Sequence, residues 1–424
     1  MSGPGRLVVV GASLAGLRAV EAARAAGFGG EITLVGAEPH LPYDRTVLSK
    51  SFLAAPAAFA GSPVPHYREP ASYTDELGVR LLLGAPATEL DASARTVRVG
   101  DSAVPYDRLV VATGVRARRL PGAVPLAGVH TLRTVDDARA LRGELGTARR
   151  VVVVGAGFIG AEVASAARAL GAEVTLLDAE RSPLSRSVGP ELGCLLTELH
   201  TDAGSRVRFG SAVERVEGAG RVERVVLRDG TALPADLVVV GIGAEPAVEW
   251  LRGSGVTLGD GVVCGSDLAT GVPGVYAAGD VLRWHNPLFG RSMRLEHWTN
   301  AAEQGAVAAR NALGQAREEY AAVPYFWSDW YGVRIQFLGI PEAERVEIVG
   351  DPAARRFVAL LGTGDRLTGV LAVDRRGEVA RYRQLLRARA TWHEARDHAA
   401  RREARRRGTT DEGRRVAAVD GGRG

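Results

Sequence analysis

A strand, a glycine-rich turn and a helix follow one another twice in this sequence, and this repeat constrains the fold more than any other feature. In the first copy, the apolar residues 7–10 lead into Gly11-Ala12-Ser13-Leu14-Ala15-Gly16 and an alanine-rich segment. In the second, residues 151–154 lead into Gly155-Ala156-Gly157-Phe158-Ile159-Gly160 and another alanine-rich segment. This order is typical of a unit that binds a dinucleotide. The repeat predicts an α/β fold with two Rossmann-like nucleotide-binding domains.

Each copy is followed by a second apolar strand that ends near an acidic residue, Glu38 in the first copy and Asp178 in the second. Such an acid can accept a hydrogen bond from a ribose hydroxyl. The glycines allow the backbone to approach a pyrophosphate, and the helix amino end adds N–H groups and a positive dipole. Ser13 replaces the middle glycine of the first motif, which weakens that copy alone. Two glycine turns in an ordinary α/β protein are the less favoured alternative.

Lys50 is the only lysine of the chain, although Lys and Arg together number 53. It ends the segment 42–50, which follows the first nucleotide motif. In a sequence so rich in arginine, chance survival of one lysine on the surface is the alternative. Its place beside a predicted nucleotide site favours a chemical role.

Composition limits the class of protein. The 424 residues, of which 46% are hydrophobic, suffice for two or three domains with full cores. A net charge of +4 does not indicate a nucleic-acid partner. Cys194 and Cys264 are far apart, which excludes a CxxC redox pair and a cysteine-held metal site, and we predict no metal. The first strand begins almost at once and no apolar run has the length of a membrane span, so we expect a cytoplasmic protein without a membrane partner.

Small residues end further strands of the two nucleotide-binding domains. Ala112-Thr113-Gly114 follows one apolar strand, and Gly241-Ile242-Gly243 follows a similar strand after the second motif. A third strand, 275–278, ends in Gly279-Asp280, where the acid could bond a ribityl hydroxyl. Glu296-His297-Trp298 precede an alanine-rich helix expected at 301–313. We also expect a hairpin at 96–106.

The character of the sequence changes after residue 321. An aromatic segment, 323–331, is followed by strand-like segments at 334–338, 346–349, 357–361 and 368–373. They predict an antiparallel sheet closed by a helix at 378–390. We therefore assign residues 1–115 and 245–320 to one nucleotide-binding domain, 116–244 to the second, 321–392 to a C-terminal α+β domain, and 393–424 to a polar, disordered tail.

Taken together, these motifs resemble those of the flavoprotein ferredoxin reductases that serve cytochrome P450s and ring-hydroxylating dioxygenases, the putidaredoxin-reductase and rubredoxin-reductase type. The resemblance covers about residues 6–386. Its most specific parts are Pro42-Tyr43-Asp44-Arg45 with Leu48-Ser49-Lys50, the motif 155–160 with Glu162, and the segments 275–280, 296–298 and 324–329. It implies a glutathione-reductase-like architecture with FAD in the first lobe and NAD(P)H in the second.

The resemblance also implies which residues contact the cofactors. For FAD these are Gly11, Ser13, Leu14, Ala15, Gly16, Glu38, Arg45, Lys50, Ala87, Ala112, Thr113, Gly114, Arg133, Gly279, Asp280, Glu296, His297 and Trp298. For NAD(P)H they are Gly155, Gly157, Phe158, Ile159, Gly160, Glu162, Asp178, Arg186 and Gly243. The chain departs from the family at Thr46-Val47, where two prolines are common, and at Trp330, where glutamine is common.

The implied reaction converts a two-electron donor into a one-electron donor. NAD(P)H would deliver a hydride to flavin N5, and single electrons would pass to a small, acidic iron–sulfur ferredoxin or rubredoxin, which supplies an oxygenase downstream. Lys50 and Glu162 are the expected catalytic pair near N5; a solvated helix glutamate is the alternative for Glu162. Asp178 favours NADH, whereas Arg181 leaves NADPH possible. We expect a monomer or homodimer.

Two other functions remain open at this point. An NADH oxidase, peroxidase or disulfide reductase needs a redox cysteine near the flavin, and residues 45–53 contain none. A signalling or assembly flavoprotein of the apoptosis-inducing-factor type would bind the same cofactors. Arg291, Arg294 and Arg334 are candidates for docking an acidic ferredoxin, or else scattered surface charge.

Overall fold

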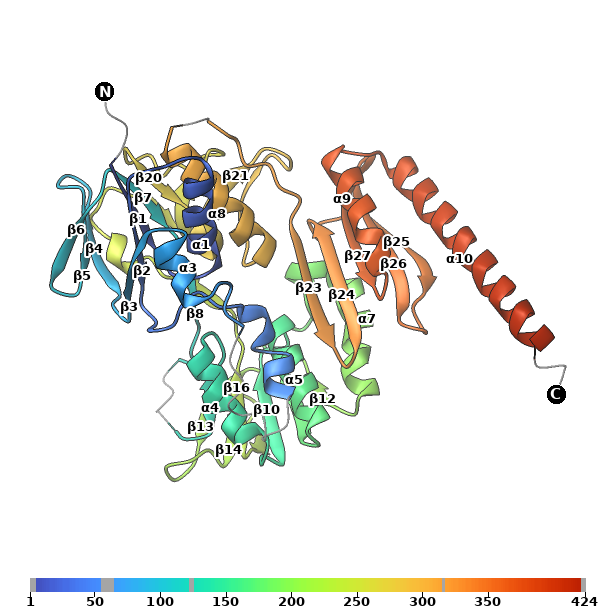
Figure 1. Ribbon diagram of the computed structural model, residues 1–424. Helices are drawn as coiled ribbons and strands as arrows, with labels where there is room; N and C mark the ends of the chain where they lie inside the picture. Colours follow the sequence, from blue (N-terminus) through green and yellow to red (C-terminus); the bar gives the residue numbers. More distant parts are fainter. Residues whose placement is uncertain (1–4, 55–64, 122–125, 315–316, 421–424) are drawn as a thin grey trace. The chain divides into compact units, whose positions relative to one another are not determined.

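The computed structural model describes residues 5–54, 65–121, 126–314 and 317–420. It divides into two compact units, the first made of Met1–Arg181 and His200–Ala322, the second of Ser182–Leu199 and Val323–Gly424 (Figure 1). The first unit holds two lobes, each built on a five-stranded parallel sheet, and the second holds an antiparallel sheet. No helix in the described part of the chain is both long and apolar enough to span a membrane.

The first lobe is built on a five-stranded parallel sheet whose central strand precedes the first glycine turn. Its order is β20-β7-β1-β2-β3, with bounds Val275–Ala277, Arg108–Val111, Arg6–Val10, Glu31–Gly36 and Val79–Leu83. The strands are continuous apolar runs because both faces of a parallel sheet are covered. Helices α1 (Leu14–Ala25) and α8 (Trp298–Ala312) lie side by side in this lobe (Figure 1).

The second lobe repeats this plan. Its parallel sheet has the order β12-β11-β10-β16-β9, with bounds Arg206–Arg208, Glu173–Leu177, Arg150–Val154, Leu237–Val240 and Val129–Thr131. Helices α5 (Phe158–Ala169) and α4 (Val135–Leu145) contribute to its core, in which Val153, Val163, Leu176 and Leu237 are buried. Both glycine turns therefore follow the central strand of a parallel sheet, as the repeat predicts.

A short segment of the first lobe packs into the second, and we call residues 43–54 the strap. It contains the 3-10 helix η1 (Arg45–Val47) and α2 (Ser51–Ala54). Leu53 is fully buried in the core formed by α4, α5 and the second sheet. Tyr43, Leu48 and Phe52 form a smaller cluster with residues of α4. The strap thus carries Lys50 from the first lobe to the second.

Smaller elements complete the first unit. The predicted hairpin is part of an antiparallel sheet of β4 (Ala87–Asp91), β5 (Thr96–Val99) and β6 (Ser102–Pro105). Strands β8 (Val115–Ala117) and β17 (Ala244–Pro246) pair where the chain passes between the lobes. The remaining elements are α3 (Pro70–Asp75), β13 (Val213–Glu217), β14 (Arg224–Leu227), β15 (Ala232–Pro234), η3 (Glu249–Leu251), β18 (Leu258–Gly259), β19 (Gly261–Cys264), η4 (Gly279–Val281), β21 (Leu282–Asn286) and β22 (Arg291–Arg294).

The second unit confirms the predicted antiparallel sheet. Its order is β23-β24-β27-β26-β25, with bounds Tyr325–Trp330, Val333–Gly339, Arg366–Val373, Arg356–Thr363 and Arg345–Asp351. The sequence analysis did not assign β23 as a strand, because its aromatic residues do not alternate with polar ones. Helices α6 (Ser185–Val188), α7 (Pro190–Asp202) and α9 (Val379–Arg387) follow elsewhere in the chain.

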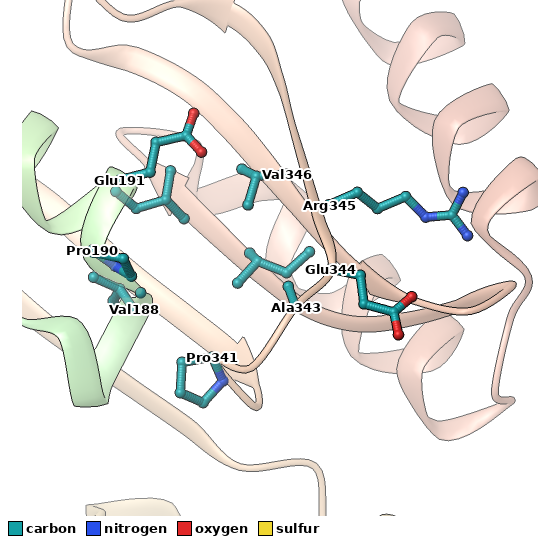
Figure 2. A pocket seen from close by; sticks show the side chains of 11 residues that line it. Val188, Pro190, Glu191, Pro341, Ala343, Glu344, Arg345 and Val346 are labelled. Carbon is teal, nitrogen blue, oxygen red and sulfur yellow. The ribbon is translucent and has the colours of Figure 1, made fainter.

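A cavity of about 210 Å³ lies between the 188–192 segment and the 341–346 segment, and the Arg345 side chain points away from it (Figure 2).

The structure differs from the predicted disordered tail at 393–424: it has a helix, α10, at Trp392–Asp420, and residues 421–424 lie outside the described part of the chain. Trp392, Ala395 and Ala399 are buried and recur at helical spacing, which gives the helix an apolar face against the sheet. One turn further, Glu403 pairs with the buried Arg375 at 2.8 Å. The high polarity of this segment led to the prediction of disorder, and its short apolar face was overlooked.

Candidate functional site

The first glycine turn brings backbone segments closer together than side chains would permit. Gly11 has φ +126°, and a Cβ there would lie 2.0 Å from the Ala112 carbonyl oxygen. A Cβ on Gly16 would lie 2.0 Å from the Gly11 carbonyl oxygen. Ser13 is the N-cap of α1, yet its side chain does not cap the helix and instead accepts a hydrogen bond from Arg45 Nε at 3.2 Å. The amino end of α1 is therefore a suitable cradle for a pyrophosphate.

Four predicted FAD contacts meet beside this turn. Arg45 Nη2 lies 2.5 Å from Glu38 Oε1, and Arg45 Nη1 donates to the Arg133 carbonyl oxygen at 2.9 Å. Arg133 Nη2 lies 3.0 Å from Asp280 Oδ2. Burial opposes the charge on Arg45, but the neighbouring Tyr43 and Glu38 outweigh it, so the pKa of Arg45 is raised. Two arginines are thus fixed close to the predicted pyrophosphate site.

Tyr43 is a member of this cluster that the sequence analysis quoted but did not assign. Its hydroxyl donates to Glu38 Oε2 at 2.6 Å and accepts from the Val135 N–H at 2.9 Å. The same oxygen accepts a hydrogen bond from Arg45 Nη1 at 2.9 Å. Burial raises the pKa of Tyr43, so the phenol stays neutral. Its position between Pro42 and Asp44 in the family-like segment was the available signal.

Gly279 lies between the first turns of α1 and α8. A Cβ there would lie 3.0 Å from the Ala15 Cβ and 3.8 Å from the Ala301 Cβ, and the backbone has φ +79°. Its N–H donates to Oε1 of the buried Gln304 at 3.0 Å. A Cβ on Gly305 would lie 2.1 Å from the Ala15 carbonyl oxygen, so α1 and α8 cross at small residues. The sequence analysis missed Gln304 and Gly305, whose roles depend on contacts between distant segments.

The start of α8 holds three further predicted contacts. Trp298 Nε1 donates to the Tyr67 hydroxyl at 3.0 Å. Burial lowers the pKa of His297 to about 4, so the imidazole is neutral at pH 7. Glu296 lies 2.7 Å from Arg294, which also contacts Asp260.

The remaining predicted contacts of the first lobe lie at the ends of its strands. Thr113 Oγ1 donates to the Ala247 carbonyl oxygen at 2.8 Å. Gly114 has φ +68°, and a Cβ there would lie 3.3 Å from Arg133 Nη2. Ala112 follows β7, and Ala87 begins β4.

The second glycine turn has the same backbone geometry and a more open surface. Gly155 has φ +102°, and a Cβ there would lie 2.2 Å from the Gly241 carbonyl oxygen. A Cβ on Gly160 would lie 2.0 Å from the Gly155 carbonyl oxygen. Gly157 is the N-cap of α5, Phe158 is half-buried, and Ile159 is 47% exposed.

Asp178 lies against this second turn. Its Oδ2 accepts a hydrogen bond from the Ala156 N–H at 2.9 Å, and its Oδ1 accepts from the Glu180 N–H at 2.9 Å. Gly243, with φ +93°, lies between β16 and β17. Arg186 lies in α6, in the second unit, so its contact with the nucleotide stays a prediction.

Trp330, where the family often has glutamine, is buried in β23, and its Nε1 donates to Ser328 Oγ at 2.7 Å.

Lys50 and Glu162 form the predicted ion pair between the lobes. Lys50 Nζ lies 2.8 Å from Glu162 Oε1 and donates to the Thr46 carbonyl oxygen at 3.2 Å. The Glu162 side chain is only 2% exposed, which excludes the alternative of a solvated glutamate. A buried carboxylate of this kind needs a charged partner.

These residues fit two dinucleotides with different functions. The first turn, with its close backbone approach and two fixed arginines, suits the pyrophosphate of FAD. The second turn, with Asp178 at hydrogen-bond distance from its backbone, suits a nicotinamide dinucleotide. An ammonium held between the lobes can stabilise negative charge on a group that accepts a hydride. The described residues include no cluster of side chains suited to a metal ion.

Comparisons with known proteins agree with this geometry. Residues 5–305 match the family model of pyridine nucleotide-disulphide oxidoreductases, and residues 325–406 match that of the reductase C-terminal domain. The chain is 39% identical over 388 residues to the ferredoxin–NAD(+) reductase component of the anthranilate 1,2-dioxygenase system of Burkholderia cepacia, covering 90% of this chain and 94% of the relative. It is 35% identical over 395 residues to a putidaredoxin reductase of Pseudomonas putida, covering 91% and 92%.

The fold is similar to solved structures as well. In the crystal structure of a covalent putidaredoxin reductase–putidaredoxin complex, a matching chain has a TM-score of 0.86 and 34% identity, with 92% of this chain and 94% of that chain covered. A ferredoxin reductase for the CYP199A2 system of Rhodopseudomonas palustris matches with a TM-score of 0.87 and 32% identity, covering 91% and 95%. The chain therefore belongs to the pyridine nucleotide-disulphide oxidoreductase family and, within it, to the flavoprotein ferredoxin reductases that carry a reductase C-terminal domain.

Proposed function

We propose that this protein takes electrons from NADH and passes them through FAD, one at a time, to a small iron–sulfur ferredoxin that supplies a cytochrome P450 or a ring-hydroxylating dioxygenase. The observation that carries the proposal is the buried Lys50–Glu162 pair, which joins a lobe suited to FAD to a lobe suited to NADH. Relatives named as reductase components of dioxygenase systems and as putidaredoxin reductase support the same conclusion.

FAD, when bound, supplies the chemistry, because a flavin can accept two electrons together and release them singly. The protein supplies position and charge. Arg45, Arg133 and the amino end of α1 would hold the pyrophosphate. The Lys50 ammonium, paired with Glu162 at 2.8 Å, would stabilise negative charge that develops on the reacting ring system. The amino end of α8, which lies near that of α1 across Gly279, would add a second positive dipole.

We propose NADH as the preferred donor because Asp178 is fixed against the second turn. A carboxylate there accepts hydrogen bonds from a ribose 2′-hydroxyl and repels a 2′-phosphate. Arg181 is the residue that argues for NADPH. Steady-state kinetics with both nucleotides test this point, and a clear preference for NADPH would contradict it.

The ferredoxin partner is expected to carry a net negative charge, as exposed arginines on this protein would favour. Arg291 is exposed, whereas Arg294 and Arg334 are partly buried. Of the three docking candidates, Arg291 is therefore the one we retain. If electrostatic attraction guides the binding of the ferredoxin, the rate of ferredoxin reduction should fall with rising salt.

NADH and ferredoxins meet in the cytoplasm, where we propose that the protein acts.

The decisive experiment is cytochrome c reduction by NADH with and without added ferredoxin. Rapid reduction only in the presence of ferredoxin would support the proposal. A slow response that does not depend on ferredoxin would contradict it and favour a signalling or assembly flavoprotein. The oxidase and disulfide-reductase alternative gains no support, since the strap has no cysteine and burial raises the pKa of the Cys264 thiol.

A further inference from the structure

The carboxylate of Glu162 is held by two consecutive residues of the strap. Its Oε1 faces Lys50 Nζ at 2.8 Å, and its Oε2 accepts a hydrogen bond from Ser49 Oγ. Ser49 is itself 3% exposed. Each oxygen of a buried carboxylate therefore has its own donor, and both donors come from the other lobe.

This arrangement limits how the ion pair can move. The terminal torsion of a glutamate is broad, and a lysine has four flexible bonds, so a simple Lys–Glu pair is poorly fixed in orientation. A hydrogen bond to Oε2 prevents rotation of the carboxylate and leaves Oε1 toward the ammonium. It also satisfies an oxygen whose burial without a partner would be unfavourable.

Lys50 is fixed from its own side as well. Its ammonium has three N–H donors, of which one serves Glu162 and one serves the Thr46 carbonyl oxygen. Thr46 is held in turn by Asp44, which accepts hydrogen bonds from the Thr46 N–H at 2.9 Å and the Thr46 hydroxyl at 2.7 Å. Among the described residues no other group accepts from this ammonium, which leaves its third N–H for a group bound in the site.

We propose that Ser49 is a positioning residue for Lys50: its hydroxyl orients the Glu162 carboxylate, and the carboxylate holds the ammonium at a single place between the lobes. The chemical purpose of this placement depends on the proposed function. The placement itself does not, because it can be measured on Lys50 without turnover.

The sole lysine makes such a measurement direct. Protein with FAD bound, produced with ¹³C-labelled lysine, carries the label at Lys50 alone. Acetylation of Lys50 by acetic anhydride, followed by peptide mass analysis, gives the accessibility of the same amine. In Ser49→Ala we expect acetylation about 10-fold faster or more, the effect of losing one hydrogen bond to a charged group, and a shifted or broadened ¹³C signal.

Ser49→Thr keeps a hydroxyl and should restore both values to within about twofold of the wild type. Ser51→Ala is the matched control, because Ser51 is exposed and lies two residues away on the same strap. If Ser49→Ala fails to fold, Ser49→Cys, whose thiol is a weak donor, takes its place and should give an intermediate rate. A folded Ser49→Ala or Ser49→Cys protein whose Lys50 reacts at the wild-type rate, with an unchanged ¹³C signal, would overturn the proposal.

A kinetic measurement links this placement to the reaction. Single-turnover flavin reduction in Ser49→Ala should slow by about 10-fold, with the apparent Kd for NADH unchanged, and Ser49→Thr should recover the rate. If Lys50 of Ser49→Ala is acetylated faster but the variant reduces its flavin at the wild-type rate, Ser49 positions Lys50 without contributing to catalysis. Absence of ferredoxin reduction in the wild type would contradict the proposed function without touching the Lys50 result.

Discussion

The two nucleotide lobes share one backbone plan and differ in what surrounds the turn. Ala15 in the first lobe and Ile159 in the second occupy corresponding positions, but Ala15 is 6% exposed and Ile159 is 47% exposed. In the first lobe α8 crosses α1 at Gly305, and the charged side chains of Glu38, Arg45, Arg133 and Asp280 meet beside the turn. In the second, the turn is bordered by Asp178. We therefore propose that the motif binds a retained cofactor, FAD, in the first lobe, where neighbouring segments enclose it, and an exchanging nucleotide in the second lobe, where they do not.

The largest expected effect concerns the strap that joins the lobes. Lys50→Met should slow flavin reduction by about 10²–10³-fold, because the charge that stabilises the transition state is removed. FAD should remain bound, since the first turn and its arginines are unchanged. Stopped-flow absorbance of the flavin measures the rate, and unchanged hydride transfer would refute the assigned role.

One substitution in each lobe should affect the binding of one nucleotide and leave the other unchanged. Arg45→Ala removes hydrogen bonds to Glu38, Tyr43 and the Arg133 carbonyl, and should weaken FAD binding by about 10–100-fold with little effect on the KM for NADH. Asp178→Asn should leave FAD binding intact and reduce the preference for NADH over NADPH by about 10-fold. Equal effects of both variants on both nucleotides would contradict the assignment of FAD to the first lobe and NADH to the second.

Exchanging the corresponding small and large residues tests enclosure itself. Ala15→Ile places three extra heavy atoms between α1, Gly279 and α8, and should lower the free energy of unfolding by about 1–3 kcal/mol and reduce FAD content. Ile159→Ala should change stability by less than about 0.5 kcal/mol and raise the KM for NADH by about 2–5-fold. Thermal unfolding and flavin absorbance measure both, and a harmless Ala15→Ile would show that the first turn is not enclosed.

Acid should destabilise the protein through two buried histidines. Burial lowers the pKa of His297, the N-cap of α8, and of His200, in α7, to about 4 each, below the usual value of 6.5. The unfolded chain therefore takes up these protons first as the pH falls, so stability decreases between pH 6.5 and 4. At pH 5.5 each histidine should lower the free energy of unfolding by about 1.4 kcal/mol. His200→Gln should flatten this dependence in denaturant titrations, and an unchanged slope would contradict it.

Local sequence patterns predicted much of this architecture. The contacts that enclose the first glycine turn could not be predicted in this way, because they join segments that are distant in the sequence. The turns at Gly11 and Gly155 are encoded by neighbouring residues, so the sequence located both. The pairing of Lys50 with Glu162 followed from family resemblance and is present in the structure. Tyr43 donates to Glu38 but also accepts from the Val135 N–H, a contact with no local signal. Ser49, Gln304 and Gly305 were missed for the same reason.

The C-terminal helix shows the opposite error, in which a local signal was present and overlooked. Residues beyond 392 are so polar that composition favoured disorder. Trp392, Ala395 and Ala399 nevertheless lie at helical spacing, and the pairing of Glu403 with the buried Arg375 gives the polar part a partner. A short apolar stripe within a charged segment can therefore indicate a docked helix.

Retention of the two dinucleotides on one protein sample tests the central claim most directly. The purified protein is saturated with FAD and NAD⁺, passed through a desalting column, and the bound nucleotides are released and quantified. We expect close to one FAD per chain and almost no NAD⁺. Loss of both nucleotides together, or retention of NAD⁺ with loss of FAD, would contradict the division of the chain into an enclosed FAD lobe and an open nicotinamide lobe.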